Sequence, residues 1–383
     1  MKQPAILPEP LGFEKILVEE DFFVEYEPHL AWPQISIVVP SFQQGRFLET
    51  TLRSLFLQNY PNLQVVLIDG GSTDETMQVI QHYRGLISYW VSEPDKGQSD
   101  ALNKGIERCT GQIFNWLNSD DWLEPGALYL IGTQFRDTEA LALTSRANIV
   151  KLNQIEYVNS ACSIFPSVWE TASVRGLNQQ GLFYRMECIR LLNGVDPLYH
   201  YSMDLDLWIR FLLSFGQERV RSSEAITANF RFHADSKSEL EGWGPGSASD
   251  IETKAMRLRF ARAYAPTFLP AMKLAYPDYA EHLLSANPHS PLRADVVKTW
   301  LSELLINQAQ AAFYENQSGI VQHRLTGWWP YYLSKPRQRD FFTYRSMEKS
   351  KWIHVFFVLM GRIFNLLPTR TVRPMEFGKR IQL

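Results

Sequence analysis

Two adjacent carboxylates, Asp120 and Asp121, follow the apolar segment IFNWLNS and are the side chains best suited to chemistry. Two acids at the end of a buried strand repel each other and resist losing water unless a cation or hydrogen-bond donors lie beside them. A divalent metal shared with a phosphate group would meet this need, because Mg²⁺ takes one or two protein carboxylates and fills its other positions with water and phosphate oxygens. The structural alternative is that Asp121 caps a helix beginning near Glu124 and Pro125.

The segments around these acids alternate between strand and helix patterns. Apolar runs predict strands at 35–39, 63–69, 87–93 and 113–119, and amphipathic patterns predict helices at 45–59, 72–80, 99–109 and 125–135. Ser72 and Glu75 have the spacing of a capping box for the second of these helices. Strands that alternate with helices in this way predict an α/β fold with an open, mostly parallel sheet flanked by helices. Neither GxGxxG nor GxxxxGK[ST] occurs, which argues against a Rossmann dehydrogenase and a P-loop kinase.

The predicted strands end in polar residues. Pro40 and Ser41 follow the first strand, Asp69 ends the second, Asp95 lies just after the third, and Asp120 follows the fourth. Ligands of open α/β sheets bind outside the carboxyl ends of the strands. We therefore expect these residues to line one crevice, where the acids would raise one another's pKa without a cation.

A second group of acids lies at the start of a later helix. Residues 183–185 predict a strand, 187–192 a short helix and 204–213 an amphipathic helix, while 136–175 predict only short strands and loops. Asp204 and Asp206 fall in the first turn of the helix at 204–213, where the helix dipole favours carboxylates. Capping would account for one of them, so a catalytic role for the other is plausible. Arg210 is expected to form an ion pair within the fold, and Arg185 to pair with acids at the crevice or with a diphosphate.

Composition predicts an ordinary folded protein. The 383 residues are 45% hydrophobic and 21% charged, and the net charge of -3 gives no drive toward nucleic acid. Three widely spaced cysteines suggest neither a disulfide framework nor a zinc site, and a reducing compartment fits them best. The acidic, proline-broken N-terminus does not resemble a signal peptide. We expect a leader at 1–34, a main domain at 35–240 and a mainly helical region at 251–383, with helices at 251–264 and 294–314.

The C-terminal tail combines basic and aromatic residues. From Lys335 onward, eleven lysines and arginines face three acids, with Trp352, Phe356 and Phe357 between them. Such a tail can lie in the headgroup region of an anionic membrane, or it can pack on the body with a solvated basic face. Residues 352–368 are the nearest approach to a membrane span, but His354 and Arg362 interrupt them.

Several motifs together resemble the family-2 glycosyltransferases, which have the GT-A fold and invert the sugar. They are VVPSFQQGRFLETTLRSLFLQNYPNLQVVLIDGGSTDET, SEPDKGQSDALNKGI, NWLNSDD and MDLDLWIRF, which occur in the family's order over roughly residues 35–240. The resemblance implies a nucleotide-sugar donor, a glycan or lipid-linked acceptor, and a cytoplasmic enzyme of polysaccharide, glycan or glycolipid synthesis, at the inner face of the membrane if the tail binds lipid.

The resemblance also assigns roles to residues. The predicted nucleotide-sugar contacts are Pro40, Ser41, Phe42, Asp69, Asp95, Gln98, Asp100, Asn118 and Asp120. A divalent metal, Mg²⁺ or Mn²⁺, is expected at Asp120, Asp121 and His233. Asp204 is expected to take the proton of the acceptor hydroxyl, with Asp206 as the alternative base that otherwise orients the loop.

Two positions depart from the family pattern. Gly70 stands where many relatives have a second Asp, which leaves the contact to the nucleobase open, and Asn118 replaces the first acid of the metal-binding DxD element. Two rival functions therefore stay open: a glycoside hydrolase, which also needs two carboxylates, and a catalytically silent nucleotide-sugar-binding or scaffold protein.

Replacing Asp204 by Asn is expected to abolish sugar transfer while leaving nucleotide affinity nearly intact. The carboxylate takes a proton only during the reaction, and general-base help of this kind is worth about 10²–10⁴-fold in rate. Transfer assays and calorimetry with the nucleotide would check both halves of this expectation. Equal transfer rates for the variant and the natural chain would remove Asp204 from the mechanism.

Overall fold

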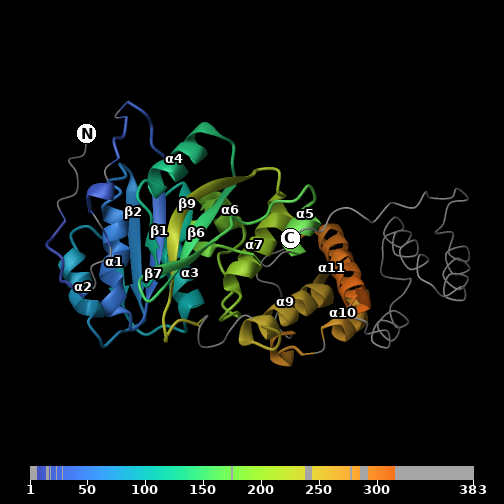
Figure 1. Cartoon of the computed structure of the whole chain (residues 1–383). Coiled ribbons are helices and arrows are strands. Elements are labelled where there is room, and N and C mark those ends of the chain that lie inside the picture. Colours follow the sequence, from blue (N-terminus) through green and yellow to red (C-terminus); the bar gives the residue numbers. More distant parts are fainter. Residues whose placement is uncertain are drawn as a thin grey trace, which may run out of the picture.

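The computed structural model describes residues 7–13, 17, 19–22, 24–27, 29–173, 176–237, 244–276, 278–284 and 292–314. Within these residues a nine-stranded sheet runs through the molecule in the order β3-β2-β1-β4-β8-β6-β9-β5, with β7 paired to β6. Helices cover both faces of the sheet, and α9, α10 and α11 gather beyond one end of it (Figure 1). The leader contributes one short 3-10 helix, η1 (Glu19–Phe22).

The first half of the sheet is parallel, as the alternating pattern predicted. Strands β2, β1 and β4 lie side by side, and β3 flanks β2. In chain order the elements of this half are β1 (Ile35–Ser41), α1 (Gly45–Phe56), β2 (Leu63–Asp69), α2 (Thr76–Tyr83), β3 (Tyr89–Ser92), α3 (Gln98–Arg108) and β4 (Ile113–Trp116). The predicted capping box is wrong, because Ser72 turns toward Asp69 and the carboxylate of Asp74 accepts from the amides of Gly45 and Thr76.

The second half of the sheet is mixed and contains the two longest strands. Its elements are β5 (Trp122–Leu123), α4 (Ala127–Asp137), β6 (Ala142–Lys151), β7 (Gln154–Asn159), β8 (Leu182–Arg185) and β9 (Val220–Phe232). The sequence predicted only short strands around β6, because this strand lacks an apolar alternation. Its polar residues are buried instead and bond to β9, as in the contacts Ser145–Thr227 and Asn148–Asn229.

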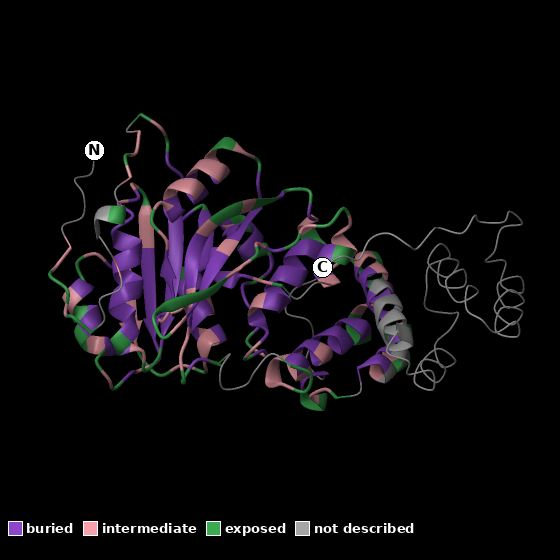
Figure 2. Cartoon of the chain, viewed as in Figure 1, coloured by how far each residue is buried: buried purple, intermediate pink, exposed green. Residues whose placement is uncertain are grey.

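The sheet separates two apolar clusters. Successive residues of β1 point to opposite faces, so that Ile37 and Val39 pack with α1, α2 and α4, whereas Val38 packs with α3. The cluster on the α3 side continues without a break through α6, α7 and α9 to α11. Buried residues accordingly fill the central strands and the inner helix faces, whereas β7 is largely exposed (Figure 2).

The part of the chain that the structure describes from Ala248 onward is mainly helical, as predicted, and shares its core with α3, α6 and α7. Helices α9 and α11 match the predicted ranges 251–264 and 294–314 closely. The remaining elements are α5 (Val168–Ser173), η2 (Gln179–Gly181), α6 (Met186–Leu191), α7 (Met203–Phe215), α9 (Ala248–Tyr264), η3 (Pro266–Phe268), α10 (Leu269–Ala275), η4 (Glu281–Leu284) and α11 (Ala294–Tyr314).

The basic tail at 335–383, with residues 352–368 inside it, lies outside the described residues. Across the part of the chain that the structure describes, every helix is too short or too polar to cross a bilayer.

All three cysteines are free and buried. Burial raises the pKa of Cys109 and of Cys188 to about 12, and it raises the pKa of Cys162 as well. The expectation that the cysteines form neither a disulfide nor a zinc site is consistent with their separate, enclosed positions.

A buried ion pair holds the loop between α6 and α7. The carboxylate of Asp206 lies 2.6 Å from Nε of Arg210, and both side chains are almost fully enclosed. Arg210 also donates to the carbonyl oxygens of Leu192 and Gly194. The expectation that Arg210 pairs within the fold is confirmed, and Asp206 acts through it on the loop that leads to Asp204.

Replacing Asp206 by Asn is expected to lower the free energy of unfolding by about 3–5 kcal/mol, because a buried guanidinium is left without its counter-charge. Urea unfolding followed by tryptophan fluorescence measures this loss. Asp235→Asn is the matched control, since Asp235 pairs with Arg46 at the surface and such a pair contributes at most about 1 kcal/mol. Equal losses in both variants would contradict the structural role of the buried pair.

Candidate functional site

The carboxyl ends of the parallel strands meet at one edge of the sheet, as predicted. Ser41 of β1 is in register with Asp69 of β2, and Asp69 is in register with Ser92 of β3. The amide of Gly70 donates to the carbonyl oxygen of Ser41. The loops after these strands are therefore neighbours, and they carry the acids that the sequence placed at a common crevice.

Asp69 connects the loop after β2 to the end of β3 through hydrogen bonds. Its side chain is fully buried, and its two oxygens accept from the hydroxyls of Ser72 and Ser92, both at 2.5 Å, and from the amides of Gly71 and Ser72. With its oxygens engaged in this way, Asp69 fixes the shape of the loop at 70–72. The residues around this loop, rather than Asp69 itself, can reach a ligand.

Phe42 and Ser41, at the end of β1 beside Asp69, are candidates to contact a ligand. The aromatic side chain of Phe42 is 59% exposed, while the hydroxyl of Ser41 is buried with no hydrogen-bond partner among the described residues. A Cβ atom at Gly70 would approach Phe42 and the carboxylate of Asp95 to about 3 Å, so only glycine lets both side chains lie this close. Pro40, one residue earlier, is part of β1 and pairs with Ile68.

Asp121 is fully buried, like Asp69. Its Oδ1 accepts from the amide of Arg231, and its Oδ2 accepts from the side-chain amides of Gln180 and Asn118. Burial and then the charge of Asp120 raise its pKa well above the usual value. This geometry rules out the capping alternative, because α4 begins only at Ala127 and Asp121 contacts none of its amides. Asp121 ties together segments on which Asp120 depends.

Asp120 is the acid that reaches the crevice. Its carboxylate lies 2.9 Å from Nε2 of His233, and its side chain keeps 17% of its surface exposed. The other ring nitrogen of His233 accepts from the amide of Asp235, which indicates that Nε2 carries the proton and donates to Asp120. The guanidinium of Arg231 fixes the backbone by donating to the carbonyl oxygen of Asp120.

A chain of polar contacts crosses the crevice. The ammonium of Lys237 donates to Oε1 of Gln98 at 2.9 Å, and Nε2 of Gln98 donates to Oδ1 of Asn118 at 2.7 Å. Asn118 in turn donates to Asp121. Asn118 stands at the first position of the DxD element. Its side-chain oxygen Oδ1 therefore already accepts a hydrogen bond from Gln98.

Asp204 lies in the first turn of α7 and is half-buried. Loss of water around the carboxyl raises its pKa to about 6, although the amide of Leu205 and the charge of Lys237 act in the opposite direction. A carboxyl that titrates just below neutral pH suits a general base. Asp100, by contrast, turns toward its own helix, where it accepts from the amide of Lys96 and lies 3.6 Å from Lys104.

Lys237 links the two halves of the site and was missed from the sequence. The charges of Asp204 and Asp120 both act on its ammonium. Although the side chain reaches the surface, loss of water around the ammonium lowers the pKa of Lys237. The signal was available, because Lys237 belongs to the same FRFHADSKS segment that suggested His233. Gln180 was also missed. Nothing in the segment NQQG distinguishes a glutamine that donates to a buried carboxylate from an ordinary loop residue.

The residues present fit a divalent ion held jointly with a diphosphate. Asp120 offers a partly exposed carboxylate beside an imidazole, and ions such as Mg²⁺ take few protein ligands when phosphate oxygens complete their shell. In the described part of the chain, no cluster of three or more His, Cys, Asp or Glu side chains is arranged for a metal. Asp121, with both oxygens engaged, supports Asp120 from behind.

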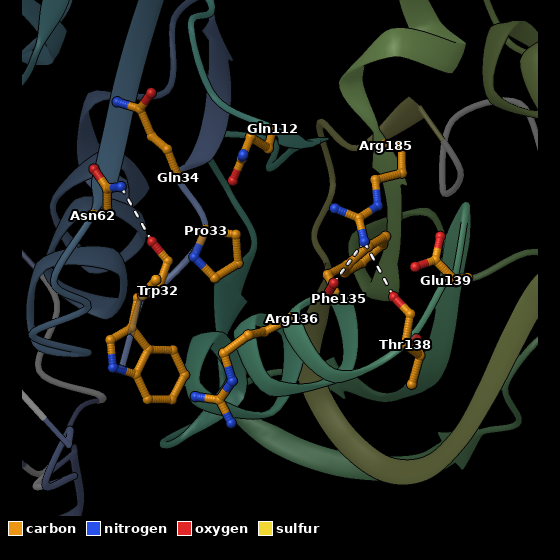
Figure 3. A pocket seen from close by; sticks show the side chains of 11 residues that line it. Trp32, Pro33, Gln34, Asn62, Gln112, Phe135, Arg136, Thr138, Glu139 and Arg185 are labelled. Atoms are coloured by element: carbon orange, nitrogen blue, oxygen red, sulfur yellow. Dashed lines mark hydrogen bonds between the residues drawn. The ribbon is translucent and has the colours of Figure 1, made fainter. Parts of the chain in front are cut away.

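A separate cavity of about 620 Å³ lies at the opposite edge of the sheet, where the parallel strands begin (Figure 3). Gln34, Asn62 and Gln112 line it from the residues just before β1, β2 and β4. Arg185 also lines it and donates to the carbonyl oxygens of Phe135, Thr138 and Ala140. The expectation that Arg185 pairs with acids of the crevice or with a diphosphate is therefore wrong, because its guanidinium closes the end of α4.

Comparison with known families gives one match. Residues 36–186 match the family described as Glycosyl transferase family 2. The matched segment contains the crevice residues from Ser41 to Asp121, whereas Asp204, His233 and Lys237 follow it.

Two curated relatives and one solved structure illustrate the likeness. A stretch of 118 residues is 32% identical to the chondroitin synthase of Escherichia coli and covers 30% of this chain and 17% of that protein. An uncharacterized glycosyltransferase of Nostoc sp. (strain PCC 7120) is 23% identical over 212 residues, which cover 52% of this chain and 65% of that protein. The chain thus spans less than two thirds of the length of either relative. Residues 1–349 of S. aureus TarS, solved with UDP-GlcNAc, align with a TM-score of 0.47 and 12% identity, covering 87% of this chain and 92% of that one.

Replacing Asp204 by Asn is expected to stabilise the fold at neutral pH. The folded chain keeps this carboxyl protonated up to about pH 6, whereas an unfolded chain ionises it near 3.8, so the natural chain loses stability as pH rises between these values. At about 1.4 kcal/mol for each pH unit between them, the variant gains up to about 3 kcal/mol at pH 8 and almost nothing at pH 4. Urea unfolding at both pH values measures the difference. A gain that is the same at pH 4 and pH 8 would contradict the raised pKa.

Proposed function

We propose that this chain, which belongs to glycosyltransferase family 2 through residues 36–186, transfers a sugar from a nucleotide-sugar donor to an acceptor hydroxyl. The family match confirms the resemblance stated from the motifs, and the sheet topology agrees with the expected GT-A-like fold class. Inversion at the anomeric carbon, a hexose as the sugar and a divalent metal are parts of the proposal.

The observation that carries the proposal is the pairing of two unlike acids around one cation. Asp120 lies beside His233 at the carboxyl edge of the sheet, while Asp204 has a pKa of about 6 at the start of α7. The charges of both acids act on Lys237. This arrangement separates a site for a charged leaving group from a site for proton removal, which is what transfer to a hydroxyl needs.

The donor would lie along the loops after β1 to β4. Phe42 offers an exposed ring for stacking on a base, and Ser41 and Asp95 offer a hydroxyl and a carboxylate for hydrogen bonds. Asp69 would shape the donor site through the loop at 70–72, since its oxygens accept from Ser72 and Ser92. Gln98 lies at the start of α3, where backbone amides and the helix dipole favour a phosphate.

The chemical step is an in-line displacement. The acceptor oxygen bonds to the anomeric carbon as the bond from that carbon to the diphosphate oxygen breaks, and the electron pair of the broken bond stays with the diphosphate. Asp204 takes the proton of the acceptor hydroxyl, for which its raised pKa is suited at neutral pH. Asp206 is not free for this role, because it is buried against Arg210.

The leaving diphosphate would be stabilised from the opposite side of the crevice. Asp120 would hold Mg²⁺ or Mn²⁺ together with the diphosphate, and the ion would stabilise the departing diphosphate without a proton transfer. His233 would orient Asp120 through its Nε2–H, and it would bind the ion itself only after losing that proton. Asp121 holds Asp120 in place through Asn118, Gln180 and the amide of Arg231. Lys237 adds a second positive charge between Asp120 and Asp204.

The acceptor belongs to the proposal as a glycan or a lipid-linked saccharide in polysaccharide, glycan or glycolipid synthesis. A lipid-linked acceptor at the inner face of the cell membrane would suit the basic, aromatic tail at 335–383. The structure does not describe that tail, so its contact with a membrane stays a prediction.

A silent nucleotide-sugar-binding protein is the second candidate. It is favoured by Asn118, because the side-chain oxygen Oδ1 of Asn118 accepts a hydrogen bond from Gln98 and is then not available to bind a metal. Such a protein would bind the donor without turning it over. The half-buried Asp204 favours the enzyme. Burial destabilises the ionised form of this carboxyl, and such a group would not help to bind a nucleotide alone.

A panel of nucleotide sugars, each with and without Mn²⁺, is expected to yield one donor that raises the unfolding midpoint by several degrees only when Mn²⁺ is present. A ligand at a hundred times its Kd stabilises a fold by about 2.7 kcal/mol. Thermal shift identifies the donor, and release of nucleoside diphosphate in the presence of acceptor sugars measures transfer.

The variants Asp120→Asn and Asp204→Asn separate donor binding from sugar transfer. Asp120→Asn is expected to lose the Mn²⁺-dependent stabilisation, whereas Asp204→Asn is expected to keep it and lose transfer. Donor binding without turnover against a broad acceptor panel would support the silent protein, and cleavage of glycosides without a nucleotide would support a hydrolase. No shift with any donor would overturn the proposed function.

A further inference from the structure

The turn before α7 is held by a carboxylate from a different helix. Glu252 of α9 accepts three backbone hydrogen bonds, from the amides of His200 at 2.9 Å, Tyr201 at 2.8 Å and Ser202 at 2.9 Å. Three consecutive amides that point at one carboxylate fix the backbone of the turn closely. Asp204 follows this turn by two residues.

Glu252 binds the amides just before α7, and the N-cap residue of that helix does not cap it. Ser202 is the N-cap residue of α7, but its side chain accepts no hydrogen bond from the amides of that helix. Its hydroxyl instead donates to the carbonyl oxygen of Ser249 on α9. The first amides of a helix need acceptors, and the positive end of the helix dipole favours an anion. Glu252 of α9 meets the second need, because its carboxylate lies at the amides of residues 200–202, just before α7 begins at Met203.

The turn is held from its other side by the crevice itself. The ammonium of Lys237 donates to the carbonyl oxygen of His200 at 3.0 Å and to Gln98 at 2.9 Å. The imidazole of His200 packs against Gly97, at the start of α3. The turn at 200–202 therefore lies between α9 and the loop that would face the donor phosphates.

Other residues of α9 extend the contact along the same loop. Arg259 lies 2.5 Å from the carboxylate of Asp196 and donates to the hydroxyl of Tyr199 at 3.1 Å. The loop from 196 to 202 is thus fixed at several points by one helix. None of these α9 residues falls within the matched family segment, which ends at residue 186.

We propose that Glu252 is a positioning residue that holds Asp204 in place for proton removal from the acceptor. The inference rests on the proposed function, and it assigns to α9 a part in the active site. Glu252 itself touches backbone amides and not the reacting atoms. Loss of its carboxylate frees the turn and moves Asp204, and a displacement of about 1 Å can cost 10²-fold in rate.

The charge of Glu252 gives a second readout. The charged and titratable groups that act on Asp204 or respond to it are Glu252 on α9, Lys237 after β9, Tyr184 on β8 and Cys162 after β7. The negative charge of Glu252 is among those that raise the pKa of Asp204. Removing that charge lowers the pKa of Asp204, so the acidic limb of the rate profile moves to lower pH.

The test compares Glu252→Gln, Glu252→Asp and Glu187→Gln in the full chain. Glu187→Gln removes the same charge from an exposed position in the first turn of α6 and serves as the control. Hydrogen exchange at the amides of residues 200–202, donor Kd by calorimetry, and kcat for transfer from pH 5 to 8 are measured for each. The exchange measurement needs no activity, so it separates the clamp from the proposed function.

In Glu252→Gln we expect exchange at residues 200–202 to rise at least about tenfold and kcat to fall about 10–10²-fold, with donor Kd unchanged within about twofold. The acidic limb of its pH–rate profile should move to lower pH. Glu252→Asp should restore part of the protection from exchange and part of kcat. Should Glu252→Gln fail to fold, Glu252→Asp is compared directly with the natural chain. Natural exchange and natural kcat in Glu252→Gln would overturn the inference alone. An inactive natural chain with every donor would overturn the proposed function, and this inference with it.

Discussion

A fully buried carboxylate at the end of a strand is the constraint on which the site depends. Asp121 can keep this position only if donors surround it, because an unpaired charge or polar group in the interior is costly. The donors come from Asn118 in the same turn, from Gln180 before β8 and from the amide of Arg231 in β9. Satisfying one acid thereby joins both halves of the sheet and leaves its neighbour Asp120 facing outward.

The same division of labour recurs between acids at the other strand ends. Asp69 is enclosed by hydroxyls and amides and shapes a loop, while Asp95 lies beside Gly70 with room to meet a ligand. Asp206 is paired with Arg210, whereas Asp204 stays half-buried with a raised pKa. In each case one carboxylate is enclosed by several donors, and a second one nearby stays partly exposed. Catalytic acids are expected to be of the second kind.

The sequence predicted the parallel half of the sheet because its strands are apolar, its helices are amphipathic and each strand ends in a polar loop. The long strand β9 and most of β6 escaped detection, since their polar residues are buried against each other and hide the alternation. Side chains could be predicted where they follow a strand, as with Asp120. Gln180 and Glu252 could not be found, because their partners are an acid or backbone amides about fifty residues or more away.

The sheet as a wall between two apolar clusters has an evolutionary consequence. Substitutions that repack α7 and the helices after it act on one cluster, and the packing beneath α1 and α2 on the far face is insulated from them. Gln98 on α3 and Asp204 on α7 both lie on helices of the cluster that drift in the C-terminal helices would disturb, whereas the packing beneath α1, α2 and α4 keeps its geometry.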